Sequence, residues 1–258
     1  MLERIDYDER QHAVYSAGRA LSPESARLWS GVFARWAGPA RPLTALDLGS
    51  GTGRFTPLLA EAFGGPVYGV EPSERMREQA AVHPNVQYLA GSAEAIPLPD
   101  RSCDVVVLFL VLHHVADRAA AAAEISRVLR PGGRLLIRST FPDRMPDLLW
   151  HRFIPGARRV EQQIFPTLAE VTGLFELAGL SVAGLERVRE TTATDPAAYA
   201  RRLRLRAIST FEHLSDDEIE RGFAALDAAI AAGDVTGPIT SDCDLLVLEA
   251  GPRDRGER

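Results

Sequence analysis

The chain has 258 residues, of which 46% are hydrophobic and 25% are charged, and its formal net charge is −6. These proportions are typical of globular proteins and exclude a mostly disordered or fibrous chain. The acidic balance disfavours a nucleic-acid partner, two cysteines are too few for a disulfide framework, and no apolar run reaches the roughly 20 residues that span a bilayer. We expect a cytoplasmic protein without a membrane partner or a metal site; the composition leaves a monomer and a homodimer equally open.

Residues 1–42 are predicted to form an N-terminal helical arm. Trp29, Val32, Phe33 and Trp36 recur at three- and four-residue spacing, which is the pattern of one apolar helix face. Two prolines after this stripe end the helix.

Residues 43–141 are predicted to form an α/β core, because short apolar strands alternate with helical segments. Alternation of this kind predicts a doubly wound, parallel sheet with right-handed crossovers. Ser73 and Asp117 are expected to cap two of the helices, and Pro131-Gly132-Gly133 is expected to end the second of them. The predicted strands are 43–48, 67–71, 86–90, 104–110 and 134–139.

Residues 142–258 are predicted to add a helical lid and the last two strands to the same domain. The strands are expected at 182–188 and 244–249, and the helices at 196–213, at 216–232 and within 148–179, with breaks at Pro155 and Pro166. The lid is rich in large apolar side chains, which either form the wall of a pocket for an apolar or aromatic small molecule or pack the lid on the sheet. These are Leu148, Leu149, Trp150, Phe153, Ile154, Ile164 and Phe165.

The basic run Arg201–Arg206 lies on one of these predicted helices. Either it faces an acidic substrate or partner, or it is a solvated helix surface.

A glycine-rich loop follows the first strand of the core and carries the strongest functional signal. Gly49, Gly51 and Gly53 alternate before a helix, so the backbone can turn sharply and a ligand can lie against its free amide groups. A tight strand-to-helix turn without a ligand has the same pattern. Glu71 ends the next strand 20 residues after Gly51, a spacing at which an acid can bind ribose hydroxyls.

The loop does not fit the two commonest nucleotide-binding fingerprints. The nicotinamide pattern G-x-G-x-x-G needs a glycine where Arg54 stands. Asp47, just before the glycines, would repel a pyrophosphate but attract a ligand that carries an amino group or a sulfonium. A P-loop is excluded because no Lys-Ser or Lys-Thr pair follows the glycines.

Five segments in order resemble a class I S-adenosylmethionine-dependent methyltransferase. The resemblance is strongest over 43–139 and implies a three-layer, Rossmann-like fold with a seven-stranded, mostly parallel sheet, an antiparallel last strand and a helical lid. The segments are D-L-G-S-G-T-G (47–53), G-V-E-P-S (69–73), G-S-A-E-A-I-P-L-P-D-R-S-C-D (91–104), L-H-H-V (112–115) and R-V-L-R-P-G-G-R-L (127–135).

The resemblance implies S-adenosyl-L-methionine as cofactor and a role for thirteen residues. Asp47 would orient the amino group through water, and Glu71 would accept the ribose hydroxyls; a solvated charge at the strand end is the alternative for Glu71. Gly49, Ser50, Gly51 and Gly53 would line the methionine and ribose. Pro72 and Met76 would flank the adenine, and Ser92 and Ala93 would meet the edge of the adenine. Phe109 and Leu110 would pack near the methionine chain, and Arg19 would pair with the methionine carboxylate.

Three of these assignments have alternatives or departures. Met76 also suits a core position, and Arg19, in a segment that closes over the cofactor in many relatives, is equally compatible with a surface arginine. The family usually has aspartate at position 92. Ser92 can accept the same hydrogen bond without charge, so adenine binding would depend more on the backbone of Ala93.

Methyl transfer to oxygen or nitrogen also requires loss of a proton, and histidine is a suitable base near neutral pH. His113 and His114 are the candidate catalytic residues at the ligand-binding edge of the sheet, although both could instead hold the loop backbone. His151 and Tyr15 are weaker candidates.

The predicted function is therefore methyl transfer to an O, N or C atom of a small, apolar or aromatic molecule of the kind made in specialised metabolism. Two alternatives remain open from the sequence. One is a methyltransferase of a protein, peptide or RNA; the other is a nicotinamide-dependent oxidoreductase or a cofactor binder without catalysis.

Overall fold

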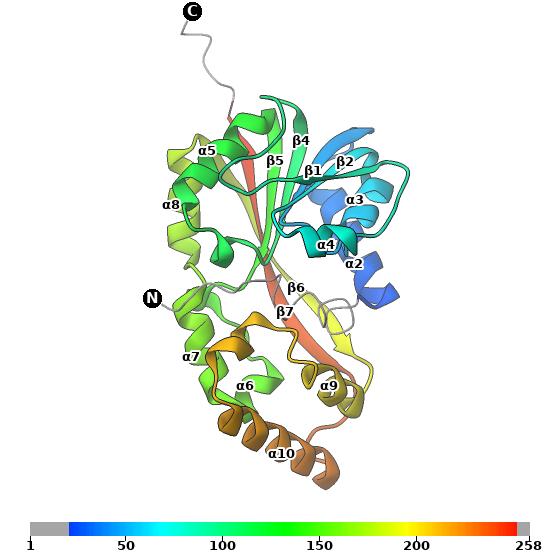
Figure 1. Cartoon of the computed structure of the whole chain (residues 1–258), viewed down its shortest axis with the longest axis vertical. Helices are drawn as coiled ribbons and strands as arrows, with labels where there is room; N and C mark the ends of the chain where they lie inside the picture. Colours follow the sequence, from blue (N-terminus) through cyan, green and yellow to red (C-terminus); the bar gives the residue numbers. More distant parts are fainter. Residues whose placement is uncertain (1–20, 252–258) are drawn as a thin grey trace, which may run out of the picture.

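The computed structural model describes residues 21–251, which build one seven-stranded sheet with helices on both faces (Figure 1). The strand order is β3-β2-β1-β4-β5-β7-β6; β1 to β5 are parallel, and β7 is antiparallel to both β5 and β6. This confirms the predicted fold and its antiparallel last strand. The strands are β1 (Leu43–Leu48), β2 (Gly64–Glu71), β3 (Val86–Ala90), β4 (Cys103–Phe109), β5 (Leu129–Ser139), β6 (Leu180–Ala193) and β7 (Ile239–Ala250).

The sheet is buried between two helical layers, so its central strands are apolar on both faces. On one face, Val105 and Val107 of β4 pack with α2 (Pro23–Trp36) and α3 (Thr56–Phe63). On the other face, Val106 and Leu108 pack with α5 (Arg118–Val128) and α8 (Leu168–Leu177). The apolar run predicted as a covered strand is therefore the centre of the core.

Side-chain caps start the helices where the sequence predicts. Ser73 accepts a hydrogen bond from the amide of Met76 at 3.1 Å and begins α4 (Glu74–Glu78). Asp117 accepts from the amide of Ala120 at 2.9 Å and begins α5. Both residues satisfy an amide that a helix start leaves without a backbone partner.

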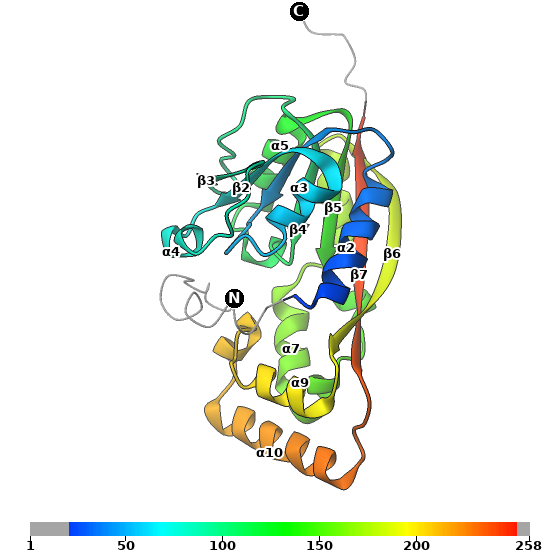
Figure 2. The ribbon, with the colours of Figure 1, turned by 90° about the vertical axis from the view of Figure 1, so that its right-hand side faces the viewer.

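A second group of helices, here called the cap, lies at the far ends of β6 and β7, which extend beyond the other strands (Figures 1 and 2). Its own apolar cluster includes Trp150, Ile154, Phe211 and Phe223. The cap consists of α6 (Leu149–Phe153), α7 (Pro155–Ile164), α9 (Pro196–Leu203), the 3₁₀ turn η4 (Ser209–His213) and α10 (Asp216–Ala232).

Two predicted boundaries are wrong. The helix predicted over 196–213 is broken into α9 and η4, and Arg206 between them has a left-handed φ of 50° that no helix continues through. The strand predicted over 134–139 begins five residues earlier, because Leu129, directly after α5, is already extended and pairs with Cys103 of β4. Pro131-Gly132-Gly133 therefore lies within β5 and does not end the helix, although the helix ends within one residue of the predicted Leu129.

The described part of the predicted N-terminal arm packs on the sheet. Trp29, Val32 and Phe33 of α2 are buried against β4, β5 and β7, which confirms the apolar stripe. Residues 1–20, which include Tyr15 and Arg19, lie outside the described residues.

Candidate active site

The glycine loop joins β1 to α3 with left-handed backbone conformations that only glycine adopts without strain. Gly49 has a φ of 73°, and a Cβ there would lie 2.6 Å from Cγ2 of Val111. Gly53 has a φ of 69°, and a Cβ there would overlap the hydroxyl of Tyr88 and lie 2.8 Å from its Cζ. Both positions therefore exclude a side chain for reasons of conformation and of space.

Glu71, at the end of β2, is hydrogen bonded to this loop. Its two carboxylate oxygens accept from the amides of Gly51 and Ser73, each at 3.0 Å, and only 8% of the residue is exposed. A carboxylate has about four acceptor positions, so these two bonds are compatible with two further hydroxyl donors. The arrangement brings Gly51 and Glu71 together, as their spacing predicts, and its chemistry fits a ribose.

Asp47 lies beneath the loop and is almost completely buried. It accepts a hydrogen bond from the hydroxyl of Thr56 at 2.7 Å. Burial raises the pKa of Asp47 to about 6; the bond from Thr56 and the charge of Arg54 oppose this shift, and the charge of Glu71 adds to it. A carboxylate held this way is stabilised by a positive group nearby, which fits the amino group or sulfonium of the implied cofactor.

The residues predicted to meet adenine follow β2 and β3. Pro72 is exposed and Ser92 forms an isolated bridge with Ala95. Ala93 is buried in the core beside α5, and Met76 is only 2% exposed. The burial of Met76 agrees with the core position that the sequence left open for it.

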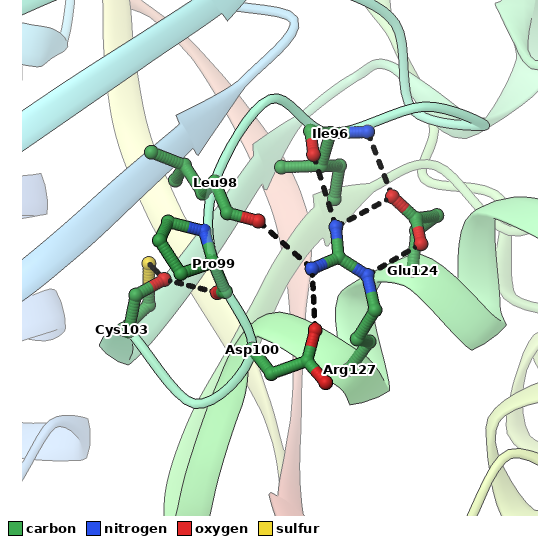
Figure 3. Close-up of polar contacts among 8 residues, drawn as sticks. Ile96, Leu98, Pro99, Asp100, Cys103, Glu124 and Arg127 are labelled. Carbon is green, nitrogen blue, oxygen red and sulfur yellow. Dashed lines mark hydrogen bonds and ion pairs between the residues drawn. The ribbon is translucent and has the colours of Figure 1, made fainter.

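Arg127 holds the segment that carries Ser92 and Ala93 against α5 (Figure 3). Its guanidinium donates to the carbonyl of Ile96 at 3.0 Å and to that of Leu98 at 2.8 Å, and it pairs with Asp100 and Glu124. The motifs at 91–104 and 127–135 are therefore parts of one contact in the fold.

A large pocket opens between the carboxyl ends of β4 and β5 and the cap. Leu110, His113 and His114 line it on the side of the sheet. The two imidazole rings lie 3.8 Å apart, and the ring of His113 lies 4.1 Å from that of Phe165. Leu110 has a left-handed φ of 55°, a strained conformation for leucine at the end of the central strand. The structure thus brings the histidines and the lid together.

The apolar lid residues divide between the pocket and the cap interior. Leu148, Leu149, Trp150 and Phe165 line the pocket. Phe153 and Ile154 do not line it and pack within the cap cluster, to which Leu148, Leu149 and Trp150 also belong. Part of the set therefore forms a pocket wall, and the packing contacts of this cluster lie within the cap and not on the sheet.

Phe109 and Leu110, the two residues predicted to pack near the methionine chain, point in different directions. The ring of Phe109 stacks on Phe55, 3.6 Å between centroids, and meets Phe33 edge-on at 5.0 Å. It belongs to the core cluster under α2 and α3, while its neighbour Leu110 reaches the pocket.

A buried ion pair at the floor of the pocket was not predicted. Arg138 of β5 pairs with Glu190 of β6, which also accepts from the indole of Trp29 at 2.8 Å. Burial alone would raise the pKa of Glu190, but Arg138 and the hydrogen bonds outweigh it and the pKa is lowered. The feature of the sequence that could have indicated this pair is Arg138, a charged residue within the otherwise apolar run of β5.

The basic run at 201–206 is mostly paired on the cap surface. Arg204 pairs with Asp227, and Arg206 pairs with Asp216 at 2.6 Å. Arg202, by contrast, lines the pocket and donates to the carbonyl of Thr192 at 3.0 Å. The solvated-surface interpretation therefore holds for all but one of the residues for which contacts are described.

Within residues 21–251, no cluster of three or more His, Cys, Asp or Glu side chains has the arrangement of a metal site. In the same part of the chain, every helix is too short or too polar to cross a bilayer.

Comparison with known proteins identifies the core. Residues 46–137 match a family model described as a methyltransferase domain. An uncharacterized methyltransferase of Mycobacterium tuberculosis is 41% identical over 133 residues, which cover 51% of either chain. The demethylmenaquinone methyltransferase of Staphylococcus aureus is 33% identical over 132 residues, which cover 49% of this chain and 55% of that one. The chain thus spans about half the length of the curated relatives it matches.

Similarity to solved structures extends beyond this core. A putative methyltransferase from an antibiotic biosynthesis pathway of Anabaena variabilis superposes with a TM-score of 0.69 at 24% identity, over 86% of this chain and 98% of that one. Residues 46–137 are therefore similar to methyltransferase domains, and the chain has the Rossmann-like fold of the solved methyltransferase to which it is similar.

Proposed function

We propose that this chain transfers a methyl group from S-adenosyl-L-methionine to an O, N or C atom of a small molecule. The observation that carries the proposal is the contact between Glu71 and the amide of Gly51, which joins the glycine loop to an acid suited to ribose, beside a pocket under a cap. The similarity of residues 46–137 to methyltransferase domains supports the same activity.

The cofactor supplies a methyl group on a positively charged sulfur when it is bound. In this proposal Gly49, Gly51 and Gly53 bind its methionine and ribose portion, and Glu71 accepts the ribose hydroxyls. Asp47 orients the amino group, whose positive charge opposes the effect of burial and stabilises the ionised carboxylate. Pro72, Ser92 and Ala93 contact the adenine.

The protein's main contribution to the reaction is positioning and exclusion of water, because the leaving group is already good. The pocket is lined by Leu149, Trp150 and Phe165 from the cap. These side chains suit an apolar or aromatic substrate. If the acceptor is oxygen or nitrogen, His113 or His114 receives its proton.

The alternatives fit the site less well. Residues of the cap line the pocket and favour a small substrate over a folded protein or an RNA. The acidic net charge also disfavours RNA. A nicotinamide cofactor would place its pyrophosphate near the buried Asp47.

Two measurements test the proposal. Calorimetric titration with S-adenosylmethionine and with NAD should show binding of the first; tight NAD binding without heat from S-adenosylmethionine would refute it. Incubation of cell extracts with the enzyme and deuterated-methyl cofactor should then yield a labelled small molecule that mass spectrometry identifies.

A further inference from the structure

Three elements of the cap bring polar side chains together in its interior. Glu161 of α7 and His151 of α6 are 5% and 6% exposed, and Thr210 of η4 is fully buried. The hydroxyl of Thr210 donates to Oε1 of Glu161 at 3.3 Å, and Nε2 of His151 lies 3.1 Å from Oε2 of Glu161. The sequence indicated none of this grouping, because 59 residues separate its first and last members.

The cluster is not internally satisfied. Although Nε2 of His151 is close to Oε2 of Glu161, the two atoms do not meet in hydrogen-bonding geometry, and neither has another partner among the described residues. A buried polar atom without a partner is costly, and a buried carboxylate especially so. A cluster whose only role was to join α6 to α7 would be expected to close this bond.

Glu161 and Thr210 both line the pocket between the cap and the sheet, whereas His151 does not. Oε2 of Glu161 is itself covered and lies on the side of His151. The acid that carries the unsatisfied acceptor is therefore part of the wall of the pocket that His113 and His114 also line.

We propose that Glu161 is a substrate-binding residue that accepts a hydrogen bond from a hydroxyl group of an otherwise apolar substrate, with Thr210 holding its carboxylate in place. The proposal rests on the proposed function in one respect: it takes this pocket as the substrate pocket of the methyltransferase.

The surroundings of Glu161 favour a neutral donor. A carboxylate repels an anionic group. Arg202 lines the same pocket, and Arg202 and Glu161 both act electrostatically on Tyr199, which indicates that the two charges lie near each other. The positive charge of Arg202 therefore disfavours a cationic group on the substrate. The neighbouring walls, Leu149 and Trp150, are apolar. A hydroxyl on an aromatic or aliphatic body fits both features.

The test uses two probes with the same ring system, 2-naphthol and its methyl ether 2-methoxynaphthalene, in which a methyl group replaces the hydroxyl proton and removes the donor. Calorimetry would measure their binding to the whole protein saturated with S-adenosylhomocysteine, so that no methyl transfer occurs. We expect the wild type to bind 2-naphthol at least about tenfold more tightly, as one hydrogen bond to a charged acceptor implies.

Variants then locate the preference. In Glu161→Leu it should fall to about twofold or less, and in Glu161→Gln and Thr210→Val to intermediate values, whereas the control Glu176→Gln, an exposed carboxylate on α8, should keep it. Because the preference is a ratio measured within each variant, a general loss of stability does not produce it. If Glu161→Leu does not fold, Glu161→Gln and Thr210→Val decide the question.

Two results would overturn the proposal: equal or absent binding of the two probes by the wild type, or an undiminished preference in the folded Glu161 and Thr210 variants. Failure of the wild type to bind S-adenosylhomocysteine is a different result, because it refutes the proposed methyltransferase function itself.

Discussion

Replacing Glu71 with glutamine should separate cofactor binding from folding. The carboxylate accepts from the amides of Gly51 and Ser73 at 3.0 Å each, and the proposed function adds the ribose hydroxyls as further donors. Glutamine keeps the shape of the side chain but has one acceptor oxygen, and its amide nitrogen donates. Either the amide of Gly51 or the amide of Ser73, which donate to different carboxylate oxygens, will therefore face a donor.

The size of both effects follows from these contacts. Loss of the charged acceptor should weaken cofactor binding by about 1–3 kcal/mol, which is roughly a 5- to 150-fold increase in Kd. A buried amide left without an acceptor costs about 1–3 kcal/mol in the free energy of unfolding. The variant should therefore fold, with a lower stability and a much weaker cofactor affinity.

Calorimetry with S-adenosylhomocysteine and with its 2′,3′-dideoxy analogue measures the ribose contribution directly. The wild type should bind the dideoxy analogue more weakly, and Glu71→Gln should show little further loss between the two ligands. Glu78→Gln, an exposed carboxylate on α4, is the control and should behave as the wild type. If Glu71→Gln retained the wild-type Kd, the carboxylate would not bind the ribose.

Three further predictions test the loop and the pocket. The pKa of Asp47 is about 6 in the folded protein and 3.8 in the unfolded chain, so the native state binds more protons between these pH values and its stability falls as pH rises through them. Asp47→Asn removes this loss. Its free energy of unfolding relative to the wild type should therefore increase by up to about 3 kcal/mol between pH 4 and pH 7.5, measured by denaturant titration. A pH-independent difference would contradict the raised pKa. Gly53→Ala should destabilise the fold by more than the roughly 1–2 kcal/mol that a left-handed alanine costs, because its Cβ would clash with Tyr88. The control Gly132→Ala has a similar φ of 76° and no atom within 4 Å of the new Cβ, so it should cost only that conformational amount. Equal losses of stability in the two variants would show that Tyr88 moves away at no cost. His113→Ala and His114→Ala should be compared by turnover once a labelled product is known: the base should lose about 10²–10⁴-fold, and wild-type turnover in both would leave neither as the base.

The sheet and the glycine loop were predictable because local signals and tertiary structure agree there. The apolar run of β4 is buried on both faces, and the spacing of Gly51 and Glu71 corresponds to a direct hydrogen bond. The caps formed by Ser73 and Asp117 depend only on residues three positions away.

The pocket was less predictable, because it depends on contacts between distant segments. Arg138 and Glu190 come from strands that meet only through β7, and Glu161 is grouped with His151 and Thr210 by the packing of the cap. Strand alternation fixes that the neighbours Phe109 and Leu110 point to opposite faces, but not which face adjoins the pocket.

The extended ends of β6 and β7 have a consequence for how such enzymes diversify. The cap helices are inserted before β6 and between β6 and β7, outside the segment 46–137 that matches the domain family. The half that would recognise the cofactor and the half that would recognise the acceptor molecule are therefore encoded in separate stretches of sequence. Evolution, or an engineer, can exchange one stretch for a new molecular preference and leave the methyl-donor machinery unaltered.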